Sequence, residues 1–143
     1  MPYNDYRTAL VTGASTGMGE AITRCLVAHD ITVHAVARNE SSLQKLAAEL
    51  GVIPHALDLR DLDAVAEQLS GLEIDILVNC AGVSRPGNVL DSSADDLDAL
   101  VDVNLRAILQ LARILVPGMV ERDLGHVVNI SSIGVLTNAP RFS

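Results

Sequence analysis

The sequence predicts an α/β fold: a doubly wound parallel sheet of the Rossmann type, with five strands in the order 3-2-1-4-5. Two observations predict it. Short apolar runs alternate with amphipathic segments along the chain. Because connections of helix length separate the expected strands, the strands are expected to lie parallel. Polar and glycine-rich clusters follow these runs, and such sheets bind ligands at the carboxyl ends of their strands. With 143 residues, the chain is expected to form a single domain, 1–143.

Five apolar runs and four amphipathic segments define the expected elements. The runs are short and nearly continuously apolar, which is typical of strands covered on both faces. The helical segments carry apolar residues three and four positions apart, between capping and turn residues. The expected strands are 7–12, 31–37, 52–57, 74–78 and 126–130, and the expected helices are 17–29, 43–50, 62–69 and 93–122.

The same periodicity predicts which helix faces are buried. The apolar face of the first helix is expected to hold Met18, Ala21, Ile22, Cys25 and Leu26. Pro117 is expected to kink the long helix or to end its regular part, because proline has no backbone N–H to donate. The apolar face of this long helix is expected to hold Leu97, Leu100, Val101, Ile108, Leu111 and Leu115.

The segment 12–19, Thr-Gly-Ala-Ser-Thr-Gly-Met-Gly, is the first candidate binding site. It joins a strand to a helix, whose N-terminus attracts phosphate through unpaired N–H groups and a positive dipole end. Its spacing is G-x3-G-x-G rather than the common G-x-G-x-x-G, so a plain strand-to-helix connection is the alternative. The candidate cofactor-binding residues here are Gly13, Ser15, Thr16, Gly17, Met18 and Gly19.

Two further strand ends carry candidate cofactor contacts. Arg38 follows the second strand, where a guanidinium would pair with a 2′-phosphate and an acid would bind a ribose 2′-hydroxyl. NADP(H) is therefore favoured over NAD(H); the alternative is a solvated arginine that balances Glu40. At the end of the third strand, Asp58 could accept a hydrogen bond from an adenine amino group beside the Leu59 backbone. The alternative is that Asp58 or Asp61 caps the next helix.

Polar residues at two other places are candidates for the chemical step. Asn104 lies on the expected apolar stripe of the long helix, where an amide needs partners. It either bonds a neighbouring backbone or holds a water near an active site. Ser131 and Ser132 end the fifth strand, where a hydroxyl could bond a substrate carbonyl, although serine pairs at strand ends also serve turns.

Composition excludes several classes of partner. A net charge of −8 and only three aromatic residues argue against nucleic acid and against anionic membranes. No apolar run is long enough to span a bilayer, and the N-terminus lacks a secretory pattern, so a cytoplasmic location is expected. The cysteines and histidines show no metal-ligand spacing, so no metal site is predicted.

Taken together, these residues resemble the short-chain dehydrogenase/reductase family. The segment 12–19 is similar to its T-G-x-x-x-G-x-G turn, and 79–82, Asn-Cys-Ala-Gly, is similar to its N-N-A-G motif with cysteine at the second position. The resemblance adds Asn79, Ala81 and Gly82 to the cofactor-binding residues. Asp58 and Leu59 are similar to the adenine-contacting pair. Asn104 and Ser132 fall where the family has its catalytic asparagine and serine.

The resemblance implies an NAD(P)-dependent oxidoreductase that acts on a small carbonyl or alcohol. The family's spacing puts its catalytic tyrosine at position 145 and its lysine at position 149, beyond Ser143. The expectation is therefore a truncated, cofactor-binding half with little or no turnover, lacking the C-terminal strands. Two alternatives are a catalytically dead dinucleotide-binding or self-associating flavodoxin-like module, and a half-site completed by another polypeptide. A homo-oligomer is expected, through the edge of strand 126–130 or through the long helix.

Overall fold

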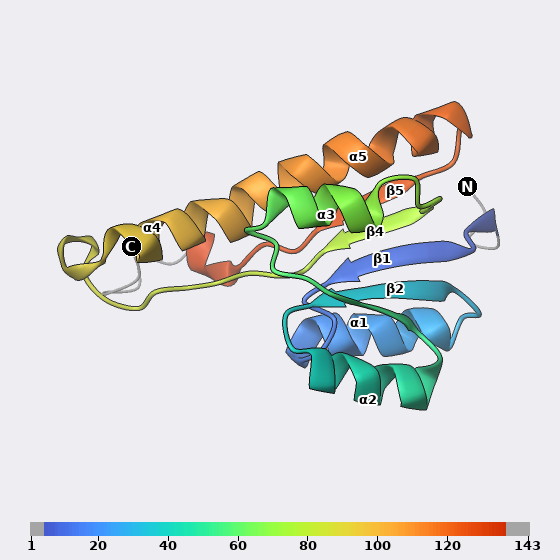
Figure 1. Cartoon of the computed structure of the whole chain (residues 1–143), viewed down its shortest axis with the longest axis horizontal. Helices are drawn as coiled ribbons and strands as arrows, with labels where there is room; N and C mark the ends of the chain where they lie inside the picture. The colour runs from blue at the N-terminus through green and yellow to red at the C-terminus, as the bar shows by residue number, and fades with distance from the viewer. Residues whose placement is uncertain (1–4, 137–143) are drawn as a thin grey trace.

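A five-stranded parallel sheet lies at the centre of the computed structural model, which describes residues 5–136 (Figure 1). Its strand order is β3-β2-β1-β4-β5, which confirms the order predicted from the sequence. All four strand pairs are parallel, so every strand ends at the same edge of the sheet. The strands are β1 (Thr8–Thr12), β2 (Thr32–Ala37), β3 (Ile53–Ala56), β4 (Ile76–Asn79) and β5 (His126–Asn129).

Helices cover both faces of this sheet, with α1 and α2 on one side and α3 and α5 on the other (Figure 1). Two apolar clusters fill the layers. Val11, Val33 and Leu43 belong to the cluster beneath α1 and α2, and Leu10, Val65 and Leu111 belong to the one beneath α3 and α5. The helices are α1 (Gly17–Val27), α2 (Glu40–Leu50), α3 (Leu62–Leu69), α4 (Ala94–Val101) and α5 (Ala107–Glu121).

The long helix expected over 93–122 is interrupted by one turn of π-helix, η3 (Asp102–Arg106), between α4 and α5. Short 3-10 turns, η2 (Val89–Asp91) and η4 (Ile133–Leu136), precede α4 and follow β5. Pro117 lies inside α5, which continues to Glu121, so of the two expected outcomes, a kink or an end of the regular helix, the second is wrong. A π-turn holds one extra residue, so the interruption changes which side chains face the sheet beyond it.

The buried face of this long helix also differs from the predicted one. Residues Ala99, Val103, Ala107, Leu111, Leu115 and Met119 are buried, four positions apart. Leu97 and Val101 were expected inside, but they are 38% and 48% exposed, in a row with Leu105 and Leu109 at 55% and 61%. The reason is the position of α4, which extends past the carboxyl edge of the sheet (Figure 1).

The predicted face of α1 is shifted in a similar way. Met18 is 58% exposed and Cys25 is exposed, whereas Gly19, Thr23 and Leu26 are buried. Thr23 is tolerated inside because its hydroxyl donates to the carbonyl oxygen of Gly19, 2.9 Å away, within the helix. A polar residue that satisfies itself locally does not follow the apolar pattern on which the expectation was based.

The amino edge of the sheet is closed by Asp75, which is 6% exposed just before β4. Its carboxylate accepts hydrogen bonds from the backbone N–H groups of Arg7 and Thr8, at 2.8 and 3.1 Å. Arg122, from the end of α5, donates to the carbonyl oxygen of Ile74 at 2.9 Å and lies 3.4 Å from the carboxylate. Within the described residues, no helix is long and apolar enough to cross a membrane.

Candidate functional site

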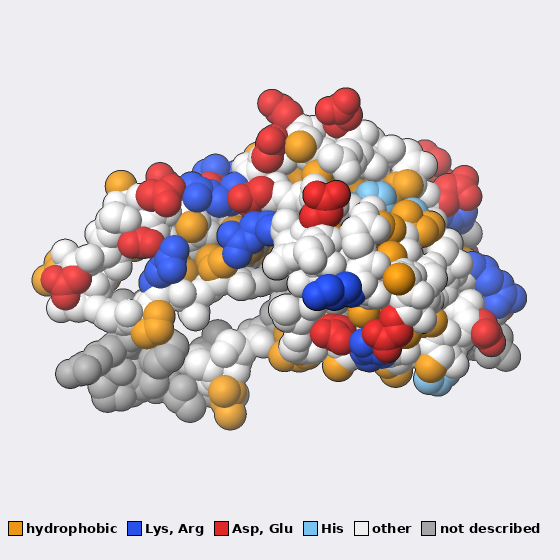
Figure 2. All heavy atoms as spheres, turned by 60° about the horizontal axis from the view of Figure 1, so that its bottom comes forward, with side chains coloured by type: hydrophobic (Ala, Val, Ile, Leu, Met, Phe, Trp, Pro, Cys, Tyr) orange, Lys and Arg blue, Asp and Glu red, His pale blue; other side chains and the backbone are white. Residues whose placement is uncertain are grey.

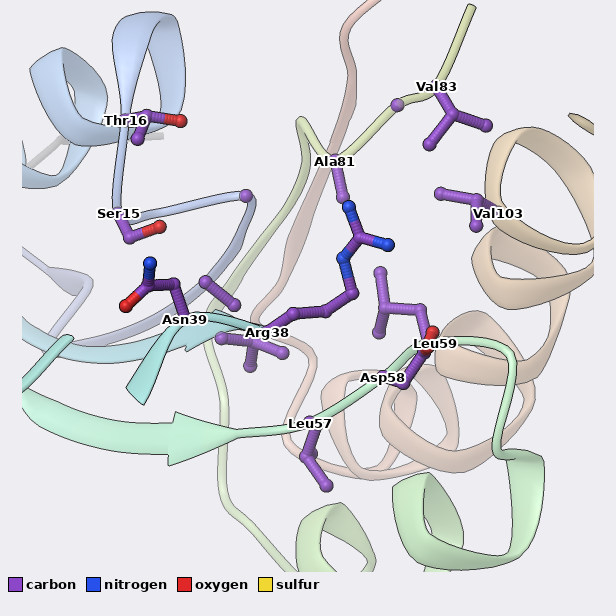
Figure 3. Close-up of a pocket in the computed structure, with 14 residues that line it drawn as sticks. Ser15, Thr16, Arg38, Asn39, Leu57, Asp58, Leu59, Ala81, Val83 and Val103 are labelled. Atoms are coloured by element: carbon purple, nitrogen blue, oxygen red, sulfur yellow. The ribbon is translucent and has the colours of Figure 1, made fainter. Parts of the chain in front are cut away.

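A cavity of about 610 Å³ opens at the carboxyl edge of the sheet (Figure 3). The segments that follow β1, β2, β3 and β4 line it, and Val103 of the π-turn closes one side. Among the predicted site residues, Gly13, Ser15, Thr16, Arg38, Asp58, Leu59, Ala81 and Gly82 line this cavity. The other predicted residues, Gly17, Met18, Gly19, Asn79, Asn104 and Ser132, do not line it.

The turn between β1 and α1 is built on close backbone contacts that only glycine allows. Gly13 has a φ of +68°, and a Cβ there would lie 3.0 Å from the Cα of Ala81. A Cβ on Gly19 would overlap the carbonyl oxygen of Gly13, because the start of α1 packs directly on the turn. The N-cap residue Thr16 makes no side-chain capping bond, so the first N–H groups of α1 are left for another acceptor.

Thr12 joins this turn to the one after β4, and sequence reasoning did not assign it a role. Its hydroxyl is buried, and it accepts hydrogen bonds from the backbone N–H groups of Cys80 and Ala81, both at 3.0 Å. A signal for this role was available, since the residue is polar and ends a run that is otherwise apolar. Burial raises the pKa of the neighbouring Cys80 thiol, which favours the protonated form.

Arg38 extends from the end of β2 into the middle of the cavity (Figure 3). Its guanidinium forms no ion pair or hydrogen bond within residues 5–136, and Glu40 does not pair with it. The next residue, Asn39, also lines the cavity and caps α2 by accepting from the N–H of Ser42 at 2.9 Å. An unpaired cation therefore faces the space above the strand ends.

Neighbouring residues in the segment that follows β3 make different contacts. Asp61 is the N-cap of α3 and accepts from the N–H of Ala64 at 3.0 Å, so the capping alternative applies to Asp61. Asp58 accepts from the backbone N–H of Arg60 at 3.0 Å and lies at the cavity. Leu59 is 7% exposed and supplies an apolar wall. This arrangement leaves a carboxylate and an apolar surface side by side.

Asn79 lies deeper than the resemblance implied. Its amide is 2% exposed and donates to the side-chain oxygen of Asn129, 2.8 Å away on β5. Its own side-chain oxygen has no hydrogen-bond partner within the described residues. Asn79 therefore joins β4 to β5, and its side chain does not reach the cavity.

Asn104 lies in the π-turn and is exposed, not buried as the apolar stripe predicted. Its side-chain oxygen accepts from the backbone N–H of Val83 at 2.9 Å, and its amide nitrogen donates to the carbonyl oxygen of Val83 at 2.8 Å. The alternative in which it bonds a neighbouring backbone is therefore observed. This pair of bonds fixes Val83, which lines the cavity, and the water-holding role stays a prediction.

Ser132 follows β5 and is exposed. Its hydroxyl accepts from the N–H of Gly134 at 3.0 Å, which is the turn chemistry expected of a serine at a strand end. The structure does not bring Ser132 to the lining of the cavity, so its catalytic role remains a prediction. Positions 137–143 lie outside the described residues.

Comparisons with known proteins agree with this architecture. The short chain dehydrogenase family matches residues 7–143. The chain is 38% identical over 143 residues to an uncharacterized short-chain type dehydrogenase/reductase, y4eK, of Sinorhizobium fredii, and 39% identical over 133 residues to the NADP-dependent 3-hydroxy acid dehydrogenase YdfG of Escherichia coli. These alignments cover 99% and 86% of this chain, but 58% and 53% of the relatives. The chain thus spans about half the length of the relatives it matches.

Among solved structures, the closed form of a serine dehydrogenase complexed with NADP+ superposes with a TM-score of 0.87 at 36% sequence identity. That superposition covers 94% of this chain and 57% of the other. The described sheet and its helices therefore correspond to part of a longer chain.

Proposed function

Because the chain belongs to the short-chain dehydrogenase family, we propose that it binds NADP(H) in the cavity at the carboxyl edge, as the cofactor-binding half of an oxidoreductase. The volume, about 610 Å³, lies in the usual range for small-molecule sites. The backbone approach at Gly13 and the uncapped start of α1 suit a pyrophosphate, which needs close N–H donors. The residues present therefore fit a dinucleotide.

The observation that carries the choice of NADP(H) is the unpaired guanidinium of Arg38. It stands at the end of β2, and an acidic residue that could hold a ribose 2′-hydroxyl is absent from that position. A 2′-phosphate would supply the anion that Arg38 lacks, and arginine binds phosphate oxygens in pairs. Asp58 and Leu59 would hold the adenine, one by accepting from its amino group and the other by apolar contact.

For the chemical step we propose hydride transfer between the nicotinamide, which supplies or accepts the hydride when bound, and a small carbonyl or alcohol. Ser132 is proposed to orient the substrate oxygen, and Asn104 is proposed to support a proton-relay water while it fixes Val83. The general acid and the ribose-binding lysine of the family correspond to positions 145 and 149. A polypeptide of residues 1–143 does not include these positions, so we expect it to turn over little substrate.

A cofactor titration tests the binding proposal. NADPH and NADH are titrated into the 143-residue polypeptide, and we expect NADPH to bind at least tenfold more tightly, about 1.4 kcal/mol. Arg38→Asp should remove this preference, because it replaces with an anion the one cation among the described residues that line the cavity. The matched control is Arg113→Asp, an exposed arginine on α5 that bonds Gln110 away from the cavity. Failure of the folded wild type to bind either cofactor contradicts the proposal.

We also propose that the chain self-associates. One candidate surface is the exposed row Leu97, Val101, Leu105 and Leu109, because water-exposed leucines in one line favour burial against a partner. The other is β5, which pairs only with β4 in the described sheet, with Val127 40% exposed. Sedimentation of Leu105→Asp and of Val127→Lys separates the two surfaces, since only the substitution at the real interface should give a monomer. A monomeric wild type contradicts both.

A further inference from the structure

Arg60 lies directly behind the adenine side of the cavity and connects two of its walls. Its guanidinium lies 2.7 Å from the carboxylate of Asp95, in the first turn of α4, and 3.6 Å from that of Asp102, at the start of the π-turn. The residue before Arg60 is Leu59, and the residue after Asp102 is Val103. Both of these neighbours are buried, and they line the cavity from two different elements (Figure 3).

The same helix end is held from a second side. Arg85, two residues beyond Val83 in the segment after β4, lies 2.6 Å from the carboxylate of Asp96. Asp102 is also 2.6 Å from Arg106, one turn further along. In Figure 2, basic and acidic side chains alternate over the part of the molecule where α4 extends past the sheet. The start of α4 is thus joined by ion pairs to two cavity-lining segments.

Burial distinguishes the members of this network. The Asp102 side chain is 15% exposed and that of Arg60 is 34% exposed, whereas Asp95 is 75% exposed. Single exposed ion pairs contribute little to stability, so we expect the loss of the Arg60–Asp95 pair alone to change the stability of the chain only slightly. Arg60 follows β3, whereas its two partners Asp95 and Asp102 lie in α4 and the π-turn. The cation therefore holds the segment after β3 close to α4, and without it the two carboxylates lose the partner that they share.

We propose that Arg60 is a positioning residue for the dinucleotide: it holds the wall with Leu59 at a fixed distance from the wall with Val103, so that the adenine fits between them. The inference rests on the proposed cofactor function. Arg60 itself touches no part of the cofactor, because it does not line the cavity. It acts through the position of its own backbone, whose N–H donates to the Asp58 carboxylate, and of the adjacent Leu59.

The test uses Arg60→Met in the 143-residue polypeptide, which keeps the length of the side chain and removes its charge. NADPH and 2′,5′-ADP, which lacks the nicotinamide half, are titrated into both proteins. We expect both ligands to bind about three- to tenfold more weakly to the variant. Arg60→Lys should retain most of the affinity because an ammonium can still pair with Asp95. Arg113→Met is the matched control, and it should bind both ligands as the wild type does.

Urea unfolding of the same proteins separates positioning from stability. A lower urea midpoint with unchanged affinity of the folded variant would overturn the proposal, as would a loss seen with NADPH but not with 2′,5′-ADP. If Arg60→Met does not fold, Asp95→Asn removes the exposed partner alone and should weaken both ligands in the same direction. If the wild type binds no NADPH, the proposed function itself is contradicted. If the wild type binds NADPH and Arg60→Met binds it equally well, only the role of Arg60 is contradicted.

Discussion

The two edges of the sheet differ in how completely their polar groups are paired. At the amino edge, Asp75 accepts two backbone N–H groups and meets Arg122, so charge and hydrogen bonds are matched within the fold. At the carboxyl edge, the first turn of α1 has no side-chain cap and the guanidinium of Arg38 has no partner among the described residues. The same parallel sheet therefore pairs its polar groups within the fold at the amino edge and leaves hydrogen-bond donors unpaired at the carboxyl edge, where such sheets bind ligands.

We expect the largest effect at the carboxyl edge from Gly19→Ala. The added methyl would overlap the Gly13 carbonyl oxygen, so α1 must move away from the turn. We expect a loss of about 2 to 3 kcal/mol in the free energy of unfolding, with no measurable NADPH binding. Urea unfolding and a cofactor titration measure the two effects.

The control is Gly118→Ala in α5. A Cβ there meets only the flexible end of Arg122, at the Nη1 atom that does not bond Asp75. Stability should stay the same or rise by up to about 1 kcal/mol, since alanine favours helix. An equal loss in both variants would contradict the steric argument.

The amino edge is tested by Asp75→Asn. Burial by itself raises the pKa of this carboxyl, but the N–H groups of Arg7 and Thr8, the Thr8 hydroxyl and Arg122 outweigh it, so the pKa is lowered. Its contribution is therefore present above the pKa of the unfolded chain, about 3.9, and is lost as the pH falls through the lower folded value. We expect the variant to lose about 2 kcal/mol at pH 7.

Two measurements check this second prediction. Urea unfolding at pH 7 and pH 3 should show the difference between wild type and variant shrinking in acid. The NADPH affinity of the folded variant should match that of the wild type, because Asp75 lies at the opposite edge from the cavity. A large change in affinity would mean that the two edges are not independent.

A smaller effect should follow from Asn104→Ala, which removes both bonds to Val83. We expect a loss of about 1 kcal/mol in stability and a severalfold loss of NADPH affinity, because Val83 lines the cavity. Asn88→Ala is the control: that asparagine bonds the N–H of Leu90 in the same connection, but it does not line the cavity. Equal affinities for the two variants would show that fixing Val83 does not matter.

The smallest effect concerns two histidines on neighbouring strands, away from the amino and carboxyl edges. Nδ1 of His34 on β2 lies 2.9 Å from Nε2 of His55 on β3. Burial lowers the pKa of both imidazoles, and the neighbouring His34 charge lowers that of His55 further. The neutral forms are therefore favoured in the fold, so stability is lost as the pH falls below the unfolded pKa of about 6.5. Between pH 7.5 and 5.5 we expect the free energy of unfolding to fall by less than about 1 kcal/mol. Urea unfolding at both pH values should show a smaller fall for His55→Gln.

Much of the fold could be predicted from local patterns. The strand order is confirmed, and most elements begin within two residues of the expected position. Apolar runs, caps such as Asn39 and Asp61, and the turn 12–19 are each specified by neighbouring residues. The buried helix faces could not be predicted as well. Met18 and Val101 lie outside because packing on the sheet, rather than periodicity, decides which side of a helix is covered.

The same division holds for the candidate site. Residues whose role depends on strand ends, such as Gly13, Arg38 and Asp58, line the cavity that the sequence predicted. Thr12, Val83 and Arg60 were missed because their partners are at least 21 residues away in the chain, as Asn104 is from Val83. The polar character of Thr12 at the end of an apolar run was a signal that it is special, but no local pattern indicates which distant residue each of them contacts.

The α/β architecture, the glycine turn and a basic residue directly after β2 follow from the amino-acid sequence alone. Each of these depends on a few adjacent residues and on general rules for parallel sheets. Three contacts could be seen only in the folded chain: Asn104 bonds Val83 from a π-turn, Asp75 closes the amino edge, and Arg60 joins α4 to the segment after β3. These contacts exist because folding brings distant residues to one place, and their strength depends on distances that spacing along the chain does not contain.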